Sequence, residues 1–210
     1  MTSTSKPGRV FLVDDDTVAL TMLGRVLERA AYHVITYESP IAFLREAVLQ
    51  PPCCVVLDLR MPAVNGLEVQ EALARRAGWV SVIYVSGFAD VRSSVEAMKR
   101  GAIEFLVKPF APVDLVEAVE TGLAGSASRA SAIADEKAAR DRLACLSSRE
   151  REVAALLAEG LRNVAIGARL GISEKTVKYH RLQLMHKLGI RSAAELVVLR
   201  FRAGEKPFCR

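Results

Sequence analysis

The stretch CVVLDLRMPAVNG at residues 54–66 decides the fold. Its apolar run, Cys54–Leu57, contains β-branched residues and ends at the polar Asp58, a pattern that predicts a buried β-strand. The residues that follow the loop, Gly66–Arg76, have the spacing of an amphipathic helix. A buried strand followed by a helix is the repeating unit of a parallel sheet, so we expect the neighbouring segments to repeat it.

The same alternation extends on both sides of this stretch, through the first 124 residues. Four more strands are predicted, at Val10–Val13, Val34–Tyr37, Val82–Val85 and Phe105–Val107. Helices are predicted at Thr17–Ala31, after the cap-like Ser39-Pro40, at Asp90–Arg100 and at Val113–Leu123. Five strands that alternate with helices predict an α/β fold, a doubly wound five-stranded parallel sheet with helices on both faces.

Polar residues follow four of these strands: Asp14-Asp15-Asp16, Asp58, Ser86-Gly87 and Lys108-Pro109. If the strand order is 2-1-3-4-5, these ends meet in one crevice beside the topological switch point. Two carboxylates about 5 Å apart repel each other by roughly 3 kcal/mol at an effective dielectric constant near 20. A cation that prefers oxygen ligands, such as Mg²⁺, relieves this repulsion. A lysine and a hydroxyl beside it suit a phosphoryl group.

Composition excludes several classes of protein. The chain has 210 residues, of which 51% are hydrophobic and 25% charged, a balance typical of one or two globular domains. We find no apolar stretch of about 18 residues and no signal-peptide pattern in MTSTSKPGRV, so we expect a cytoplasmic protein without membrane contact. The four cysteines form no CxxC pair, which argues against a disulfide framework or a zinc site: Cys53, Cys54, Cys145 and Cys209.

Charge is unevenly distributed along the chain. Residues 1–124 carry 12 Lys+Arg and 15 Asp+Glu, a net charge of −3, whereas residues 125–210 carry 17 and 9, a net charge of +8. Such asymmetry suggests nucleic-acid binding, although a solvated basic face is a commoner cause. The small, polar segment 124–142 predicts a linker that is partly helical. We therefore expect domains at 1–123 and 143–210, joined by this linker.

The basic half has the pattern of a helix-turn-helix domain. Ser147 and Glu150 form a capping-box pattern before a helix that Gly160 closes. A short helix at Asn163–Leu170 follows, then the turn Gly171-Ile172 and a longer basic helix from Ser173 to Leu188. In this arrangement the last helix enters the DNA major groove. The net charge of +7 over residues 143–210 suits contacts with phosphate.

The motifs VDDD, DLRMPAVNG, VSG and KPF, in this order, resemble the CheY-like (flavodoxin-like) receiver domain of two-component response regulators. The resemblance implies that Asp58 accepts a phosphoryl group from a sensor histidine kinase, and that Ser86 and Lys108 contact it. It implies Mg²⁺ binding by Asp15, Asp58 and the Arg60 backbone carbonyl, and by Asp14 through water. It also implies a cis Lys108–Pro109 bond and an aromatic switch residue at Phe105, although a plain core phenylalanine is the alternative there.

The segment GFADVRSSVEAMKRGAIEF, residues 87–105, resembles the nitrogen-fixation (FixJ) regulators, with departures at Phe88 and Arg92. Ser81, which precedes this segment, is a third departure. The segments LSSREREV and IGARLGISEKTVKYHRLQLMHKLGIRS resemble the LuxR/NarL-type DNA-binding domain. The resemblance implies that Lys178 and Tyr179 lie near bases and that Thr176, Arg181 and Lys187 contact the DNA backbone. The helical pattern leaves Lys175 for solvent or groove, and we expect it to contact DNA as well. Leu182 stands where a polar or charged residue is usual, so either a thymine methyl contact or packing explains it.

These patterns predict a response regulator of the FixJ/NarL family, not an enzyme. Phosphorylation would promote homodimerisation and binding to promoter DNA, with RNA polymerase a further partner if the protein is an activator. Two alternatives remain. FLVDDDTV also fits a haloacid-dehalogenase-type phosphatase, with Asp14 as nucleophile and Asp16 as acid/base, although a further acidic motif is missing. A constitutive DNA-binding protein would use the first domain for dimerisation alone.

Overall fold

The computed structural model describes residues 6–87 and 91–205. Contacts divide the chain into two compact units between Ser131 and Ala132. Three residues named above lie outside the described part: Phe88, Asp90 and Cys209. Within the described part, no helix is both long enough and apolar enough to span a bilayer.

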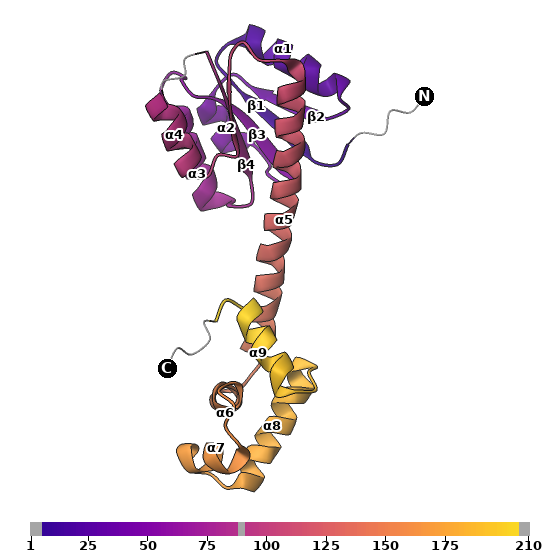
Figure 1. Ribbon diagram of the computed structural model, residues 1–210, viewed down its shortest axis with the longest axis vertical. Coiled ribbons are helices and arrows are strands. Elements are labelled where there is room, and N and C mark those ends of the chain that lie inside the picture. Colours follow the sequence, from indigo (N-terminus) through magenta and orange to yellow (C-terminus); the bar gives the residue numbers. More distant parts are fainter. Residues whose placement is uncertain (1–5, 88–90, 206–210) are drawn as a thin grey trace, which may run out of the picture. The chain divides into compact units, whose positions relative to one another are not determined.

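The N-terminal unit is the predicted α/β fold (Figure 1). Its elements are β1 (Arg9–Val13), α1 (Thr17–Arg29), β2 (His33–Tyr37), α2 (Pro40–Glu46), β3 (Cys53–Asp58), α3 (Gly66–Arg76), β4 (Ser81–Ser86), α4 (Val91–Lys99), β5 (Glu104–Val107) and α5 (Pro112–Ala144). All strand pairs are parallel and their order is β2-β1-β3-β4-β5, which confirms the predicted sheet.

Helices cover both faces of this sheet and enclose two separate cores. Helices α2, α3 and α4 pack against one face, and α1 and α5 pack against the other (Figure 1). Side chains alternate between the cores along β3, as the period of a strand requires. Cys53 therefore lies in the first core and Cys54 in the second, both fully buried, and burial raises the pKa of both thiols. Cys53 and Cys54 therefore serve as core residues on opposite faces of the sheet.

Local signals place the helix starts that border the sheet's carboxyl edge. Asp16 is the N-cap of α1, and its side chain accepts hydrogen bonds from the backbone N–H groups of Val18 and Ala19. Asn65 and Glu68 form a capping box at the start of α3. The first helix is shorter than expected: α1 ends at Arg29 rather than Ala31, because Ala31 has a left-handed φ of 65°.

Helix α5 continues through the segment expected to be a partly helical linker. Its middle turns are attached to the amino ends of β3 and β4. The fully buried Ser126 Oγ accepts the Cys53 backbone N–H at 2.9 Å. Arg129 Nη2 donates to Ser81 Oγ at 2.7 Å, and Ser81 Oγ donates to the Gly122 carbonyl at 2.5 Å. Ser81, a departure from the family pattern, thus supplies a buried hydroxyl that holds this helix.

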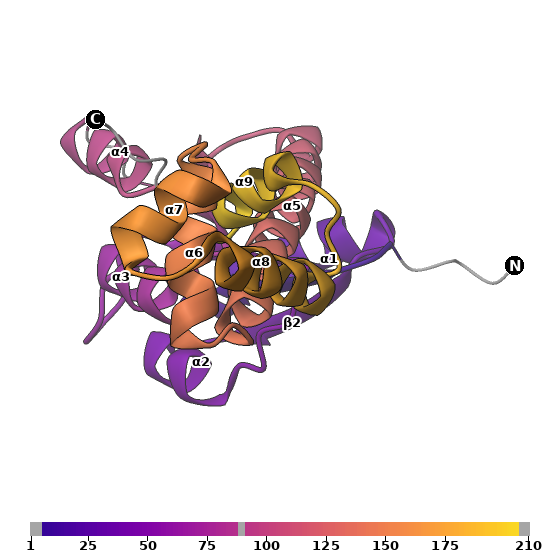
Figure 2. The same cartoon turned by 90° about the horizontal axis from the view of Figure 1, so that it is seen from below.

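The C-terminal unit consists of helices in its described part (Figures 1 and 2, orange to yellow). They are α6 (Ser148–Ala158), α7 (Asn163–Leu170), α8 (Glu174–Leu188) and α9 (Ala193–Arg202). The last turns of α5 belong to this unit as well. Ala139 is buried in its core, Arg140 Nε donates to the Ala203 carbonyl at 3.1 Å, and Arg142 donates to the Leu188 carbonyl. The two arginines therefore satisfy carbonyls at the ends of α9 and α8.

The turn between α7 and α8 depends on two glycines. Gly171 caps α7 with a left-handed φ of 66°. At Gly167 a Cβ atom would lie 2.7 Å from the Ile172 carbonyl oxygen, so a larger residue cannot fit without a shift of the turn. Ser173 then caps α8 through the Thr176 N–H. The helix-turn-helix arrangement predicted from the sequence is present.

Candidate functional site

The carboxyl edge of the sheet brings together Asp14 after β1, Asp58 at the end of β3 and Lys108 after β5. Lys108 Nζ lies 3.1 Å from Asp14 Oδ2 and 3.9 Å from Asp58 Oδ1. The Lys108 backbone N–H donates to the Ser86 carbonyl, which holds the end of β5 beside β4. The Lys108–Pro109 peptide bond is cis, as the resemblance implies. The Lys108 ammonium group thus bridges two carboxylates that follow neighbouring strands.

Asp58 is a largely buried carboxylate with a raised pKa. Its side chain is 11% exposed, and Oδ2 accepts the Arg60 backbone N–H at 2.6 Å. Burial, with a smaller contribution from the charges of Asp14 and Asp15, raises the pKa of Asp58 to about 6, although the Arg60 N–H and Lys108 oppose this rise. The site therefore carries more negative charge than Lys108 neutralises.

The three consecutive aspartates have different surroundings. Asp14 is buried, with 5% exposure, and accepts the Asp16 N–H, whereas Asp15 is exposed. The Asp16 carboxylate caps α1 by accepting two backbone N–H groups, so it is not free to serve as the acid/base of the phosphatase alternative. Among the described side chains, no three His, Cys, Asp or Glu groups converge as metal ligands. Mg²⁺ commonly takes only one or two carboxylates with water and phosphate oxygens, so this oxygen donor set fits it.

Ser86 and Phe105 lie on the adjacent strands β4 and β5. Ser86 is 2% exposed at the end of β4. The half-buried Phe105 ring stacks on Tyr84, with ring centroids 5.9 Å apart. The Tyr84 hydroxyl lies 3.0 Å from Gln70 Oε1 on α3. Phe105 is thus linked through Tyr84 to α3, a connection that the sequence analysis missed because it joins three separate segments.

Gly66 is a second residue whose role the sequence analysis missed. A Cβ atom at this position would lie 2.6 Å from the Asp58 carbonyl oxygen and 2.8 Å from the Tyr84 ring. The first turn of α3 can therefore approach the end of β3 only with glycine here. The signal was present in the quoted stretch, where Asn65-Gly66 begins the helix, but which atoms crowd the glycine depends on the fold.

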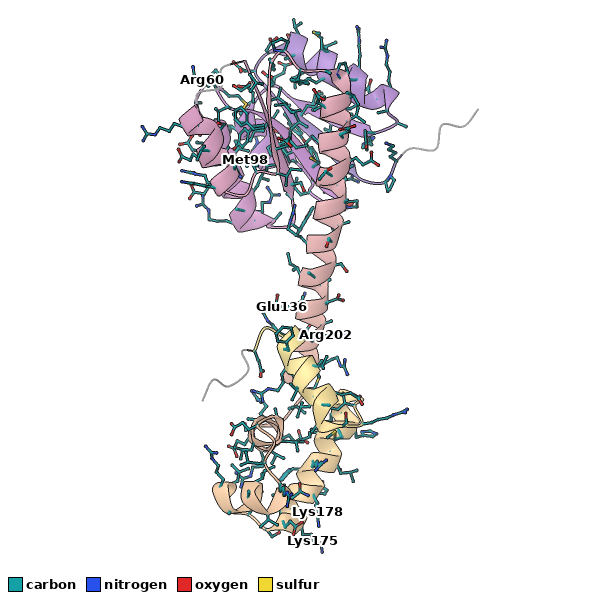
Figure 3. All side chains as sticks on the ribbon, in the orientation of Figure 1. Arg60, Met98, Glu136, Lys175, Lys178 and Arg202 are labelled. Atoms are coloured by element: carbon teal, nitrogen blue, oxygen red, sulfur yellow. The ribbon has the colours of Figure 1, made fainter. Side chains whose placement is uncertain are left out.

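In the C-terminal unit, five of the seven predicted DNA-contacting residues are exposed on α8. They are Lys175, Lys178, Tyr179, Leu182 and Lys187, and Figure 3 shows Lys175 and Lys178 at the beginning of the helix. Tyr179 is 59% and Leu182 67% exposed. Lys178 pairs with Glu174 at 2.8 Å, an exposed contact that contributes little to stability. These side chains are available to a ligand.

Three of the predicted DNA-contacting residues, including the exposed Lys187, make contacts inside the unit. Thr176 Oγ1 lies 2.8 Å from the capping Ser173 Oγ, and Arg181 Nη1 donates to Asn163 Oδ1 at 3.3 Å. Lys187 Nζ lies 2.8 Å from Glu150 Oε2.

Glu150 is the buried member of this last pair, with 5% exposure. It also accepts the Ser147 N–H, and the hydrogen bonds from Lys187 and Ser147 hold the pKa of Glu150 below its ordinary value. Lys187 therefore has a structural contact that the sequence did not indicate.

Comparison with known protein families agrees with both halves of the chain. Residues 10–120 match the response regulator receiver domain, and residues 144–200 match the luxR family of bacterial regulatory proteins. The receiver match alone covers more than half of the chain.

Full-length relatives share both domains. The transcriptional regulatory protein FixJ of Azorhizobium caulinodans is 38% identical over 198 residues, 94% of each chain. Among solved structures, the response regulator StyR is 38% identical with a TM-score of 0.80, covering 94% of this chain and 100% of its own. Full-length FixJ of B. japonicum is 33% identical with a TM-score of 0.57, covering 97% and 100%. The chain belongs to the FixJ/NarL-type response regulators, two-component transcriptional regulators that join a receiver to a LuxR-type DNA-binding domain.

Proposed function

We propose that Asp58 accepts a phosphoryl group from a phosphohistidine of a sensor kinase, and that this modification promotes dimerisation and sequence-specific binding to promoter DNA. The observation that carries the proposal is the position of Asp58. Its side chain is 11% exposed at the carboxyl edge of the sheet, with Lys108 Nζ 3.9 Å away. We expect this activity in the cytoplasm, where promoter DNA is reached.

The transfer forms one bond and breaks one. An Asp58 carboxylate oxygen attacks phosphorus, the P–O bond forms, and the P–N bond to the kinase imidazole breaks. Lys108 compensates the charge of the phosphoryl oxygens, and the Ser86 hydroxyl donates a hydrogen bond to one of them. The carboxylate is the nucleophile, so its pKa of about 6 leaves Asp58 mostly ionised at neutral pH.

Receiver domains generally bind Mg²⁺, which neutralises phosphoryl charge when it is bound. We propose that Asp15, Asp58 and the Arg60 backbone carbonyl hold it, with Asp14 acting through water. The excess negative charge around Asp58 supports a cation here. Asp14 contributes additionally through its contact with Lys108, which keeps the lysine beside Asp58.

The phosphoryl group adds roughly 1.5–2 negative charges at Asp58. Attraction of Ser86 and Lys108 toward it would move the ends of β4 and β5, and Phe105 on β5 stacks on Tyr84 of β4. A change from 1:99 to 99:1 between two receiver states needs about 5.5 kcal/mol of differential stabilisation. Because Phe105 joins β5 to β4 through its stacking on Tyr84, we assign the switch to this pair of rings.

Dimerisation would bring two copies of α8 to successive major grooves, about one DNA turn apart. Lys178 and Tyr179 would lie near bases, and Lys175 beside them at the exposed start of the helix. We propose Thr176, Arg181 and Lys187 as contacts with the DNA backbone. Each of them also contacts another residue of the unit, so it would have to divide its hydrogen bonds between that residue and a phosphate. If the protein activates transcription, RNA polymerase is a further partner.

The test compares wild type with Asp58→Asn in the presence of Mg²⁺ and beryllofluoride, a phosphoryl mimic. We expect wild type to dimerise and to bind its promoter more tightly, and Asp58→Asn to do neither. Asp135→Asn, at an exposed aspartate of α5, is the matched control and should behave like wild type. Unchanged mass and DNA affinity of the wild type would refute the proposal and favour a constitutive DNA-binding protein.

A further inference from the structure

Leu182 is a large apolar side chain on the exposed surface of α8. It is 67% exposed, whereas Val177, Leu184 and Leu188 on the same helix are buried in the core of the C-terminal unit. Among the described residues, Leu182 neither belongs to that core nor packs against it. The packing explanation for a leucine at this position is therefore excluded for the described part of the chain.

The neighbours of Leu182 are basic or polar. Lys175, Lys178 and Tyr179 precede it by seven, four and three residues, so helical periodicity puts all four on one face. All four are exposed, and Figure 3 shows Lys175 and Lys178 on this helix. The leucine thus stands within a positively charged surface, in a region with a net charge of +7 over residues 143–210. Charge complementarity favours a polyanion as its occupant.

Leucine contributes neither a hydrogen-bond donor nor an acceptor. In the major groove, the apolar group that distinguishes one base is the C5-methyl group of thymine. Lysine contacts with phosphate set the position of a protein on DNA but carry no sequence information. An exposed leucine on the same helix face as such lysines can therefore add specificity through an apolar contact.

Building on the proposed DNA binding, we propose that Leu182 is a specificity-determining residue that recognises the C5-methyl group of a thymine in each half-site. Removal of that methyl group should weaken binding about fourfold, the ratio that corresponds to about 0.8 kcal/mol for one buried methyl-sized group. Truncation of the leucine should remove this preference, because the shortened side chain no longer reaches the methyl group.

The experiment uses the full chain with Mg²⁺ and beryllofluoride. A tight-binding duplex is first selected from a random pool of about 30 base pairs, long enough for two half-sites one turn apart. Each thymine in it is then replaced, one at a time, by deoxyuridine, which pairs identically but lacks the methyl group. Fluorescence anisotropy measures the dissociation constant of every probe for wild type, Leu182→Ala, Leu182→Met and Val198→Ala.

We expect wild type to lose affinity about fourfold at one thymine per half-site, and Leu182→Ala to bind the thymine and deoxyuridine probes at that position equally. Leu182→Met, which keeps an apolar side chain of similar volume, should retain most of the preference. Val198→Ala, at a half-exposed valine of α9, should retain all of it.

Two results overturn the inference, and they are distinguishable. If wild type binds the selected duplex but no single deoxyuridine weakens binding, or if Leu182→Ala keeps the same preference as wild type, DNA binding stands and the role of Leu182 is wrong. If no duplex is enriched from the pool, the proposed sequence-specific binding fails and the inference fails with it. Circular dichroism of Leu182→Ala checks that the helix is intact.

Discussion

Replacing Asp58 by asparagine should stabilise the metal-free N-terminal unit at neutral pH, although it removes the proposed phosphorylation site. Asparagine keeps an oxygen that can accept the Arg60 N–H but carries no charge. Burial raises the pKa of Asp58 from its ordinary 3.8 to about 6, so the folded chain favours the neutral carboxyl. Ionised Asp58 is therefore a cost to the folded state, and the substitution removes that cost.

The magnitude follows from linkage between proton binding and folding. Below pH 3.8 Asp58 is protonated in both states and costs nothing. Between 3.8 and 6 only the unfolded chain ionises, so stability falls as pH rises, and above 6 the loss is complete. A difference of about two pH units corresponds to roughly 3 kcal/mol at pH 8, and to about half of that at pH 5.

The assay is urea unfolding in EDTA, followed by tryptophan fluorescence. Trp79 is the only tryptophan of the chain and packs against the core between the sheet and α2–α4, so it reports on the N-terminal unit. Asp15→Asn is the control for charge at this edge: Asp15 is exposed, so its substitution should change stability much less. Adding Mg²⁺ should stabilise wild type more than Asp58→Asn, since the cation compensates the charge that asparagine lacks.

The pH dependence decides the outcome. A gain in the free energy of unfolding that is the same at pH 5 and pH 8 would mean that the substitution acts through packing rather than charge. A loss of stability at pH 8 would mean that Lys108 and the Arg60 N–H stabilise the carboxylate more than burial destabilises it. Either result contradicts the electrostatic account of this site.

Three further substitutions test contacts elsewhere. Lys187→Met should lower the stability of the C-terminal unit by about 1 kcal/mol and shift acid unfolding to higher pH. The reason is that the hydrogen bond from Lys187 keeps the pKa of Glu150 below the ordinary value of a glutamate. This contact stabilises the folded state at pH values above that ordinary pKa, and the stabilisation is lost as the pH falls and Glu150 becomes protonated. If Lys187 also contacts a DNA phosphate, as proposed, the substitution should weaken the salt dependence of DNA binding, and an unchanged salt dependence would make the role of Lys187 structural. Gly167→Ala should lower the melting temperature measured by circular dichroism, since overpacking against the Ile172 carbonyl costs about 1–3 kcal/mol; an unchanged value would show that the turn adapts freely. Ser126→Ala should cost about 1–3 kcal/mol by Trp79 fluorescence, because the buried Cys53 N–H loses its acceptor; no loss would mean that another group replaces the hydroxyl.

The sheet and its edge could be predicted because their signals are local. Each strand is a short apolar run followed by a polar residue, and parallel strands bring those residues to one edge wherever the connections are helical. Asp58 and Lys108 were predicted to meet on this ground, and the structure brings Lys108 Nζ within 3.9 Å of Asp58. The separate surroundings of Asp14, Asp15 and Asp16 depend on backbone geometry after β1, which sequence spacing does not encode.

Contacts between distant segments could not be predicted. Lys187 and Glu150 are 37 residues apart, and nothing in the composition of α8 distinguishes this lysine from the other lysines of the helix. The helix through residues 124–142 was expected to be partial because the segment is small, polar and poor in large apolar residues. Its stability comes instead from polar anchors, Ser126 and Arg129 on the sheet and Arg140 and Arg142 on α9 and α8.

The last turns of α5 have a consequence for modularity. Arg142 satisfies a carbonyl at the end of α8 and Arg140 one at the end of α9, yet both precede the stretch that matches the luxR family, which starts at residue 144. A transplanted segment that began at residue 144 would leave both helix ends without these donors. A chimeric regulator built from this protein should therefore be joined near Ser131–Ala132, so that the DNA-binding unit carries its own caps into the new host.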